Sequence, residues 1–444
     1  MNAFSIRSAT QKMVALALLS IASNVVAADS LLLSNAIVHT ISGETFSPGQ
    51  VLIRDGKIEA VGKTASGDRA KIVDLSGMHL YPGLIALNTV LGLTEIQAIR
   101  ATQDNTESGD FTPDVESWIA ANPDSELIPV ARANGIAYFQ PVPQGTVVSG
   151  QSGLVAVDGW TTEQRTIRSP VALHVFWPTM TLNVSTRGAR REKGKSKSLD
   201  DQAKDRRAKI RAITDFFEDA QAYAKAKDAA EKSRTPQPEK IPAWEAMLPY
   251  VRSQLPIMIH ADEFREIKAV LDWAGTNKYK IIIAGARDAW RLAEPLAAKK
   301  IPVIFSDVFG LPPRDTDSYD VNFRAAGVLH KAGVQVALAF GSGSFDAALV
   351  RNLPYVAAQS VAFGLPEDEA LKSITLYPAQ LMGVSDRLGS IESGKEATLV
   401  AASGDILDIR SQIKHLWLAG REVSLESRQT RLYDKYKNRP KQNQ

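Results

Sequence analysis

Short runs of apolar residues, each ended by turn residues, fill the chain between residues 30 and 80. The runs cover residues 30–41, 50–54, 57–62 and 71–80. Asp55-Gly56 separates the second run from the third, and this dipeptide is typical of a two-residue hairpin turn. The pattern therefore predicts a small antiparallel sheet.

From residue 81 the pattern changes to short apolar runs that alternate with helical stretches. We predict eight strands, at residues 83–88, 135–140, 153–157, 172–176, 256–260, 280–284, 301–305 and 335–340. Apolar residues at helical spacing predict helices over residues 262–275, 288–299 and 321–332. Eight parallel strands with crossover helices predict an α/β fold, the (β/α)8 barrel. A doubly wound parallel sheet is the alternative, but it does not account for the antiparallel strands that precede it.

The first 28 residues have the parts of a secretory signal peptide. Arg7 and Lys12 supply positive charge, residues 13–26 form the apolar run, and Val26-Ala27-Ala28 is a small-residue cleavage site. A membrane anchor is the alternative, but the run is short and contains polar residues. We therefore expect cleavage after residue 28 and a periplasmic or secreted protein without a membrane span.

A charged segment over residues 183–240 interrupts the barrel pattern. It begins with a loop that holds six Lys and Arg residues between positions 187 and 197, and residues 200–233 then show an apolar face at helical spacing. The basic loop suits an anionic partner, but a solvated loop is the simpler interpretation. We interpret the segment as an inserted helix over or beside the barrel.

Composition narrows the chemistry and the partners. The formal net charge of +3 gives no reason to expect nucleic acid or a membrane surface as a partner, so we expect a small-molecule substrate or ligand. The chain has no cysteine, so a metal site would use His, Asp, Glu or a modified Lys.

Two phrases of the sequence carry a family resemblance. Tyr81-Pro82-Gly83-Leu84-Ile85 leads into the first predicted barrel strand. Leu388-Gly389-Ser390-Ile391, followed by Gly394-Lys395 and then Leu399-Val400, leads into returning strands near the C-terminus. With these phrases the chain resembles the amidohydrolase superfamily, in its imidazolonepropionase-like and prolidase-like branch.

The resemblance implies a domain organisation and an activity. The composite β-sandwich would take residues 29–81 and 387–425, the barrel residues 82–386, and a charged tail residues 426–444. The implied activity is hydrolysis of non-peptide carbon–nitrogen bonds in amides or cyclic amides, assisted by a divalent metal such as zinc. The implied assembly is a homodimer, or a hetero-oligomer with an active relative.

The sequence departs from the family at most metal-ligand positions. The first strand ends in Leu87-Asn88-Thr89, where the family has His-x-His, and the fourth strand has no Lys. The family's His on strand six falls near Ala284, and its Asp on strand eight falls near Gly341. His260 at the end of strand five matches. Because a catalytic zinc normally takes three protein ligands, the comparison implies that the usual binuclear centre is largely missing.

Several polar residues near the predicted strand ends are candidates for the site: Asn88, Glu95, His174, His260, Asp262, Asp307, Ser342 and Asp346. We assign His260 and Asp262 as catalytic, with His260 as the retained metal ligand, and Asn88, His174 and Ser342 as substrate-binding. The alternatives are a core histidine at His174 and a helix cap at Asp262. The Gly341–Ser344 loop follows a predicted strand and suits a small anion. Two functions remain open: a hydrolase with an atypical metal site, or an inactive barrel that binds a ligand or stabilises a partner.

Overall fold

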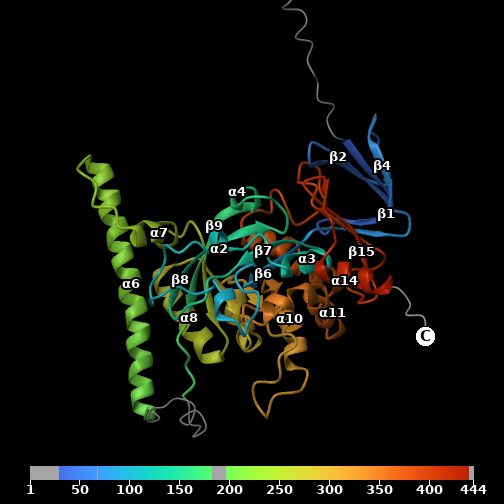
Figure 1. The fold of residues 1–444 in the computed structure, drawn as a ribbon. Helices are drawn as coiled ribbons and strands as arrows, with labels where there is room; N and C mark the ends of the chain where they lie inside the picture. The colour runs from blue at the N-terminus through green and yellow to red at the C-terminus, as the bar shows by residue number, and fades with distance from the viewer. Residues whose placement is uncertain (1–29, 68, 183–196, 440–444) are drawn as a thin grey trace, which may run out of the picture.

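Figure 1 shows the fold in a computed structural model, which describes residues 30–67, 69–182 and 197–439. The predicted signal peptide and most of the predicted basic loop, residues 183–196, lie outside the described residues. Two sheets of eight strands each organise the fold, one from both ends of the chain and one from its middle.

The first sheet joins the two ends of the chain and confirms the predicted composite sheet. Its strands are β1 (Ser30–His39), β2 (Thr45–Arg54), β3 (Lys57–Gly62), β4 (Lys71–Asp74), β5 (His79–Pro82), β14 (Leu399–Ala402), β15 (Ile413–Leu418) and β16 (Arg421–Glu422). The order is β16-β15-β14-β5-β1-β2-β3, with β4 paired to β1. The blue N-terminal strands therefore lie beside the red C-terminal segment in Figure 1.

The strand directions in this sheet differ from the predicted antiparallel arrangement. Strand β1 pairs antiparallel with β2 but parallel with β4 and with β5. The first half of β1 pairs with β4 and the second half with β5, so one edge of β1 serves two strands. The hairpin prediction is confirmed, because Asp55 and Gly56 have φ of 50° and 76° between β2 and β3, as a type I′ turn requires.

The second sheet is the barrel, and each of its strands overlaps one of the eight predicted strands. They are β6 (Leu84–Thr89), β7 (Ile136–Pro141), β8 (Val148–Ala156), β9 (Thr166–Phe176), β10 (Ile257–Ala261), β11 (Ile281–Gly285), β12 (Val303–Phe305) and β13 (Val336–Leu338). Neighbours in the sheet follow chain order from β6 to β13. Strand β8 runs antiparallel to both β7 and β9, so the prediction of eight parallel strands is wrong for this strand.

A helix covers the gap between the first and last strands of the barrel. Among the described residues β6 and β13 share no strand pairing, and α13 (Leu376–Leu381) contacts both of them. The backbone N–H of Ile85 on β6 donates to the carbonyl of Ile374, just before α13, at 3.0 Å. The sheet is thus a nearly closed barrel.

Helices surround the barrel, and the helices predicted over 262–275 and 321–332 are present with small shifts at their ends, whereas the one predicted over 288–299 is divided into a 3-10 turn and a short α-helix. The α-helices are α2 (Ser117–Ala120), α3 (Leu127–Arg132), α4 (Thr162–Arg165), α6 (Leu199–Ser233), α7 (Pro242–Val251), α8 (Phe264–Asn277), α9 (Ala293–Ala298), α10 (Val321–Lys331), α11 (Leu353–Ala362), α12 (Glu367–Ser373), α13 and α14 (Arg428–Lys437). The 3-10 turns are η1 (Arg100–Thr102), η2 (Ala289–Leu292), η3 (Asp346–Ala348) and η4 (Val350–Asn352). No helix in the described part of the chain is both long and apolar enough to cross a membrane.

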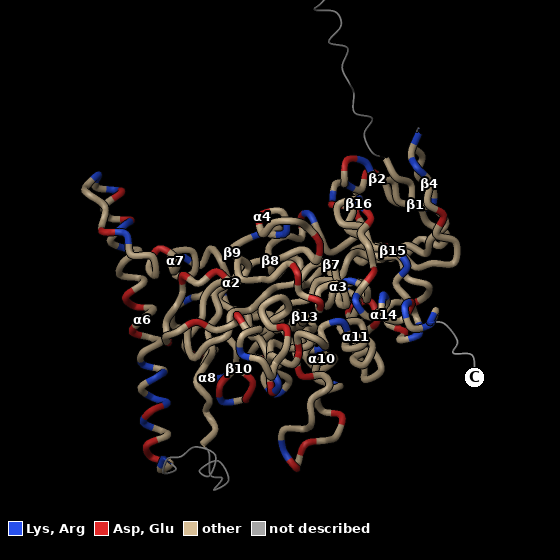
Figure 2. The backbone as a smooth tube through the Cα atoms, viewed as in Figure 1, with Lys and Arg blue, Asp and Glu red and all other residues tan. Residues whose placement is uncertain are grey.

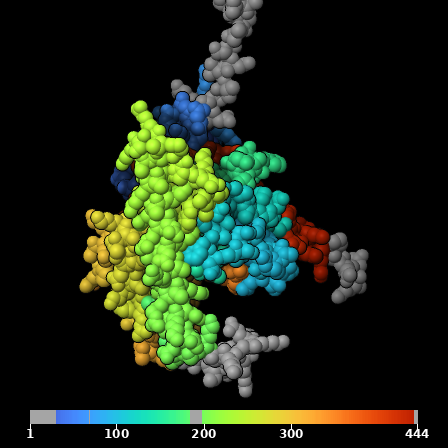
Figure 3. Space-filling model, turned by 90° about the vertical axis from the view of Figure 1, so that its left-hand side faces the viewer, coloured from blue at the N-terminus to red at the C-terminus, as the bar shows by residue number. Residues whose placement is uncertain are grey.

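Helix α6 falls within the predicted charged segment 183–240 and lies along one side of the barrel. It packs against α7, and Figure 3 shows it running down one face of the molecule. Ile213 and Phe217 of this helix are buried, and Lys, Arg, Asp and Glu alternate along its length (Figure 2). Ser198 caps its start by accepting the N–H of Asp201.

Each sheet has its own hydrophobic core. The barrel strands are buried on both faces, which explains their almost continuous apolar runs, such as Ile281-Ile282-Ile283 on β11. The composite sheet has a smaller core, centred on Trp417, Leu33 and Val51. The barrel core holds the strand ends in place, and the polar cavity described below lies at those ends.

Candidate active site

A cavity of about 820 Å³ lies at the carboxyl ends of β10 to β13. This is the end of a barrel where the loops after the strands bring side chains from several strands together. The polar residues that line it are Asn88, Thr179, His260, Asp262, Glu263, Glu266, Arg287, Ser306, Asp307, Ser342 and Asp346. Five carboxylates therefore share the cavity with one guanidinium and one imidazole.

The junction of β10 with α8 supplies four of these side chains. The predicted cap at Asp262 is not the observed one: Glu263 is the N-cap of α8, and Glu266 completes a capping box with it. The Glu266 carboxylate accepts the backbone N–H groups of Asp262 and Glu263, each at 3.0 Å. The Asp262 side chain lines the cavity and accepts a hydrogen bond from the backbone of Arg287.

His260 lines the cavity wall and is held by two neighbours from β9. Its ring stacks on Phe176, with centroids 4.0 Å apart and planes 5° from parallel. Its Nε2 lies 3.0 Å from Nδ1 of His174, whose Nε2 lies 2.7 Å from Oγ of Ser152. Burial lowers the pKa of His260 to about 3, and burial together with His260 lowers the pKa of His174. Both rings are therefore neutral at physiological pH.

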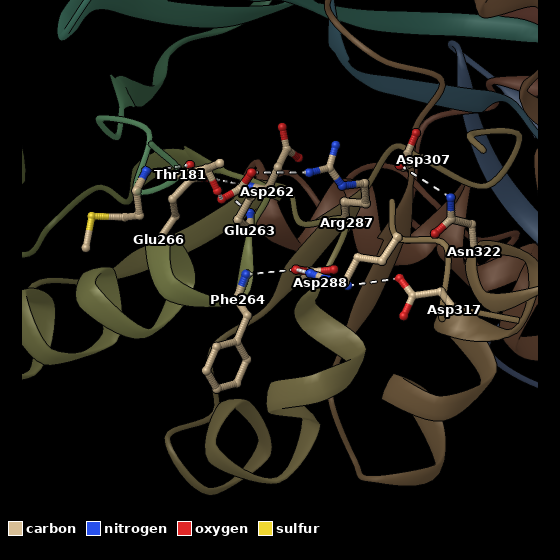
Figure 4. A network of polar contacts seen from close by, with 12 residues as sticks. Thr181, Asp262, Glu263, Phe264, Glu266, Arg287, Asp288, Asp307, Asp317 and Asn322 are labelled. Carbon is tan, nitrogen blue, oxygen red and sulfur yellow. Dashed lines mark hydrogen bonds and ion pairs between the residues drawn. The ribbon is translucent and has the colours of Figure 1, made fainter. Parts of the chain in front are cut away.

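Arg287 lies between Asp262 and Asp307 in the close view of Figure 4. It follows β11 and forms an ion pair with Glu263 at 3.8 Å. Burial raises the pKa of the Asp262 carboxyl, and the charge of Arg287 opposes that rise. Burial also raises the pKa of Asp307 to about 6, against the same opposing charge, and the neighbouring carboxylates of Asp262, Asp288 and Asp346 add to the rise.

The loop after β13 brings Ser342 to the cavity but carries its own anion. Oδ2 of Asp346 accepts the backbone N–H of Gly343 at 2.9 Å. A Cβ on Gly341 would lie 2.5 Å from that same oxygen, so the loop wraps closely around the carboxylate. The anion position expected from the Gly341–Ser344 sequence is thus taken by Asp346.

Asn88, at the end of β6, also lines the cavity. It has a positive φ of 50°, is 2% exposed, and donates from Nδ2 to Oγ of Ser306 at 3.1 Å. Its Oδ1 has no hydrogen-bond partner among the described residues. Asparagine is one of the residue types that adopt this left-handed conformation more often than most.

Most of the site residues predicted from sequence lie together. Asn88, His260, Asp262 and Ser342 all line the cavity. His174 is fully buried behind His260 and reaches the cavity only through it. Glu95 lies outside the lining and accepts hydrogen bonds from Ser125 and from the N–H of Glu126.

Sequence reasoning missed Arg287, Glu263 and Ser306. Arg287 comes three residues after the predicted strand 280–284, and Ser306 directly follows the predicted strand 301–305. Their positions just after predicted strands could have identified these two residues. A search for metal ligands does not find them, because arginine and serine are not the usual ligands.

The chain forms an eight-stranded barrel with a polar cavity at its strand ends, beside a composite sheet. Known proteins with similar sequences and structures are amidohydrolases. The sequence model of the amidohydrolase family matches residues 251–424. An amidohydrolase from Thermotoga maritima MSB8 superposes with a TM-score of 0.78 and 27% identity, over 89% of this chain and 99% of that one. A prolidase complexed with N-methylphosphonate-L-proline superposes with a TM-score of 0.54 at 14% identity, over 89% and 99%, which shows the fold alone.

A longer curated relative is also similar. The amidohydrolase tasK of Hapsidospora irregularis is 23% identical over 403 residues, which cover 84% of this chain and 39% of that protein. This chain therefore spans well under half of that relative. The family match over residues 251–424 and the solved amidohydrolase structures make this chain similar to the amidohydrolase family in sequence and in fold.

The family implies a divalent metal, and the donor atoms at the cavity do not fit one. No three His, Cys, Asp or Glu side chains among the described residues converge as a metal site would need. Nε2 of His260, the nitrogen that approaches other polar groups, is engaged by His174. Asp346 is engaged by the loop amide, and Glu266 by the start of α8.

Proposed function

We propose that the protein hydrolyses a carbon–nitrogen bond in a small amide or cyclic amide bound in this cavity. One observation carries the proposal: the segment that matches the amidohydrolase family, residues 251–424, places His260, Arg287 and Asp307 on one cavity at the strand ends. These three side chains offer a hydrogen-bond donor or acceptor, a fixed cation and a carboxylate base. Such a set can support attack of water on a carbonyl group.

In the proposed reaction Asp307 takes a proton from the attacking water. A carboxylate whose pKa is about 6 is mostly ionised at pH 7 and is a stronger base than an ordinary aspartate. Arg287 lies between two carboxylates and offers positive charge to the oxygen that becomes negative when water adds. The proton held by Asp307 then passes to the departing nitrogen as the bond breaks.

The second candidate function is ligand binding without turnover. It is favoured by one observation, that the described residues hold no group of three metal-binding side chains. A barrel can keep its cavity and lose its chemistry, since the fold alone does not confer a reaction. In this case the protein would bind a small amide in the cavity without cleaving it, or would bind and stabilise an active partner subunit.

Turnover and metal content separate the two candidates. The purified protein, with its metal content measured, is incubated with N-acyl amino acids, dipeptides and small lactams, with and without added zinc, and the released amine is quantified. Hydrolysis that falls roughly 10²-fold or more in Asp307→Asn, and is kept in Asp315→Asn on the same loop, supports the hydrolase. Thermal stabilisation by a panel compound without any product supports the binding barrel. Zinc-dependent turnover that is lost in His260→Ala contradicts the metal-free chemistry proposed here.

We also propose that the protein is exported after cleavage at residue 28. The support is the arrangement of Arg7 and Lys12, the apolar run and Val26-Ala27-Ala28 in the sequence. Expression of the full chain in a Gram-negative host, followed by fractionation and intact mass measurement, tests this. A protein that retains residues 1–28 in the cytoplasm would reject the proposal.

A further inference from the structure

Polar groups on five consecutive barrel strands join into one hydrogen-bonded chain. The backbone N–H of Asn88 on β6 donates to Oε1 of Gln140 on β7 at 3.2 Å, and Nε2 of Gln140 donates to Oγ of Ser152 on β8 at 2.9 Å. Oγ of Ser152 lies 2.7 Å from Nε2 of His174 on β9, and Nδ1 of His174 lies 3.0 Å from Nε2 of His260 on β10. Gln140, Ser152 and His174 are fully buried, so the middle of the chain is shielded from solvent.

The first bond of this chain fixes the direction of the second. A backbone N–H can only donate, so the Gln140 atom facing Asn88 is the amide oxygen, and the atom facing Ser152 is the amide nitrogen. Ser152 therefore accepts from Gln140. A hydroxyl has a single proton, and the remaining partner of Ser152 is Nε2 of His174.

The same direction continues through the two histidines. If Ser152 donates to Nε2 of His174, that nitrogen carries no proton, and the neutral ring of His174 carries its proton on Nδ1. Nδ1 of His174 then donates to Nε2 of His260. His260 in turn carries its proton on Nδ1, the ring nitrogen that has no partner among the described residues.

The opposite direction leaves a buried hydroxyl without an acceptor. If Nε2 of His174 donated to Ser152, the Ser152 oxygen would accept twice, and its own proton would have no acceptor among the described residues. A buried donor without a partner carries the full cost of its lost hydration. The direction that starts at Asn88 leaves no such group.

We propose that His260 is held as the neutral ring with its proton on Nδ1, and that it presents this N–H donor, rather than a metal-binding lone pair, to the cavity. The ligand atom it suits is an acceptor oxygen, and on the proposed function this is the carbonyl oxygen of the amide that is cleaved. Stacking on Phe176 fixes the plane of the ring. Gln140, Ser152 and His174 are positioning residues, because they act through His260 and do not line the cavity.

The tautomer can be measured without any substrate. The purified protein is labelled with ¹⁵N-histidine. Two-bond proton–nitrogen correlation spectra then distinguish a protonated ring nitrogen from an unprotonated one. The signals of His174 and His260 are assigned by their loss in His174→Gln and His260→Gln. The proposal expects a protonated Nδ1 and a bare Nε2 on both rings. A protonated Nε2 on His260, or a doubly protonated ring, would overturn it.

A serine variant tests whether the chain sets this tautomer. Ser152→Ala removes the donor to His174, so the enforced direction is lost and the His260 spectrum should move toward a mixture of tautomers. Ser149→Ala is the matched control, a buried serine on the same strand whose hydroxyl donates to the carbonyl of Pro143. An unchanged His260 tautomer in folded Ser152→Ala would refute the role of the chain. If that variant does not fold, the wild-type spectrum alone decides the proposal.

Zinc chloride provides an independent check. Because the lone pair of Nε2 is engaged by His174, stoichiometric zinc should leave the His260 nitrogen shifts unchanged. A zinc-induced shift of Nε2 would overturn the proposal. Failure to find any hydrolysed substrate would count against the proposed function but would leave these spectra as predicted, so the two failures are distinguishable.

Discussion

The hydroxyl of Tyr138 on β7 lies 2.8 Å from Oγ1 of Thr398, and this contact joins the barrel to the composite sheet. Both side chains are almost fully buried, and Oγ1 of Thr398 also accepts the N–H of Ala419 at 3.2 Å. Thr398 directly precedes β14, so the bond ties the returning segment to the second barrel strand.

Removing this bond should destabilise the whole protein. Tyr138→Phe leaves the ring in place and deletes the hydroxyl, with an expected loss of about 1 kcal/mol in the free energy of unfolding, a typical value for a buried hydrogen bond. Chemical denaturation measures it. Tyr433→Phe, an exposed tyrosine on α14, is the control and should change little. Equal stability of the two variants would show that the contact contributes nothing.

The glycine of the Pro82-Gly83 phrase lies at the same junction. A Cβ at Gly83 would lie 2.5 Å from Cβ of Ala137 and 2.7 Å from Cγ2 of Thr398. Gly83→Ala should therefore destabilise by about 1–3 kcal/mol through overpacking. Gly62→Ala is the comparison, because the nearest atom to a Cβ there is 3.8 Å away. A Gly83→Ala protein as stable as Gly62→Ala would contradict this view of the phrase.

The positions of the barrel strands could be predicted, but the direction of β8 could not be read from its apolar pattern. The predicted strand began at residue 153, which left a gap long enough for a crossover after residue 140. The observed β8 begins at Val148, only six residues (142–147) after β7 ends. Parallel neighbours need a connection of about a dozen residues or more, so this short loop gives an antiparallel pair. The Gly- and Ser-containing start of the strand, Val148-Ser149-Gly150, hid its true beginning.

The site residues that lie at strand ends could be predicted from the sequence. The contacts that depend on the alignment of one strand with the next could not. His260 and Asp262 follow from their place at the end of β10. The bond between His260 and His174 depends on how β9 and β10 are aligned, and Gln140 and Ser152 depend on two further alignments. A period-two pattern does not fix such offsets between strands distant in sequence.

Arg314 should stabilise the loop that carries Asp307. Its guanidinium bonds to the fully buried carboxylate of Asp288 and to Asp317 at 3.0 Å, and Asp288 also accepts the N–H of Phe264 at 3.0 Å (Figure 4). Arg314→Ala leaves the buried Asp288 without its cation, and we expect a loss of about 2–4 kcal/mol, because removing one partner strands the other charge.

Denaturant unfolding of Arg314→Ala gives this loss directly. Arg324→Ala on α10 is the control, since its pair with Asp320 is more exposed and should contribute under about 1 kcal/mol. Asp288→Asn in the Arg314→Ala background should recover part of the stability, because the stranded charge is then removed. No recovery would show that the loss comes from packing rather than from the unpaired charge.

The carboxyl of Asp307 should give both the stability and the activity a pH dependence near 6. Burial and neighbouring carboxylates raise its pKa from 3.8 to about 6, so the folded protein binds this proton more tightly than the unfolded chain does. The contribution to stability is thus fully present below pH 3.8 and is lost as the pH rises through about 6. Activity should change in the opposite sense, because the ionised form is the proposed base.

Asp307→Asn separates these effects from the rest of the protein. The difference in melting temperature between wild type and Asp307→Asn should change between pH 4 and pH 6, with the wild type losing ground as pH rises. With any substrate found, wild-type kcat/KM should rise through an apparent pKa near 6, and the variant should lack that rise. Asp315→Asn controls for loss of a charge on the same loop. If the difference in melting temperature between wild type and Asp307→Asn stays constant from pH 4 to pH 6, the pKa of Asp307 is not raised. The assignment of Asp307 as the base would then be rejected.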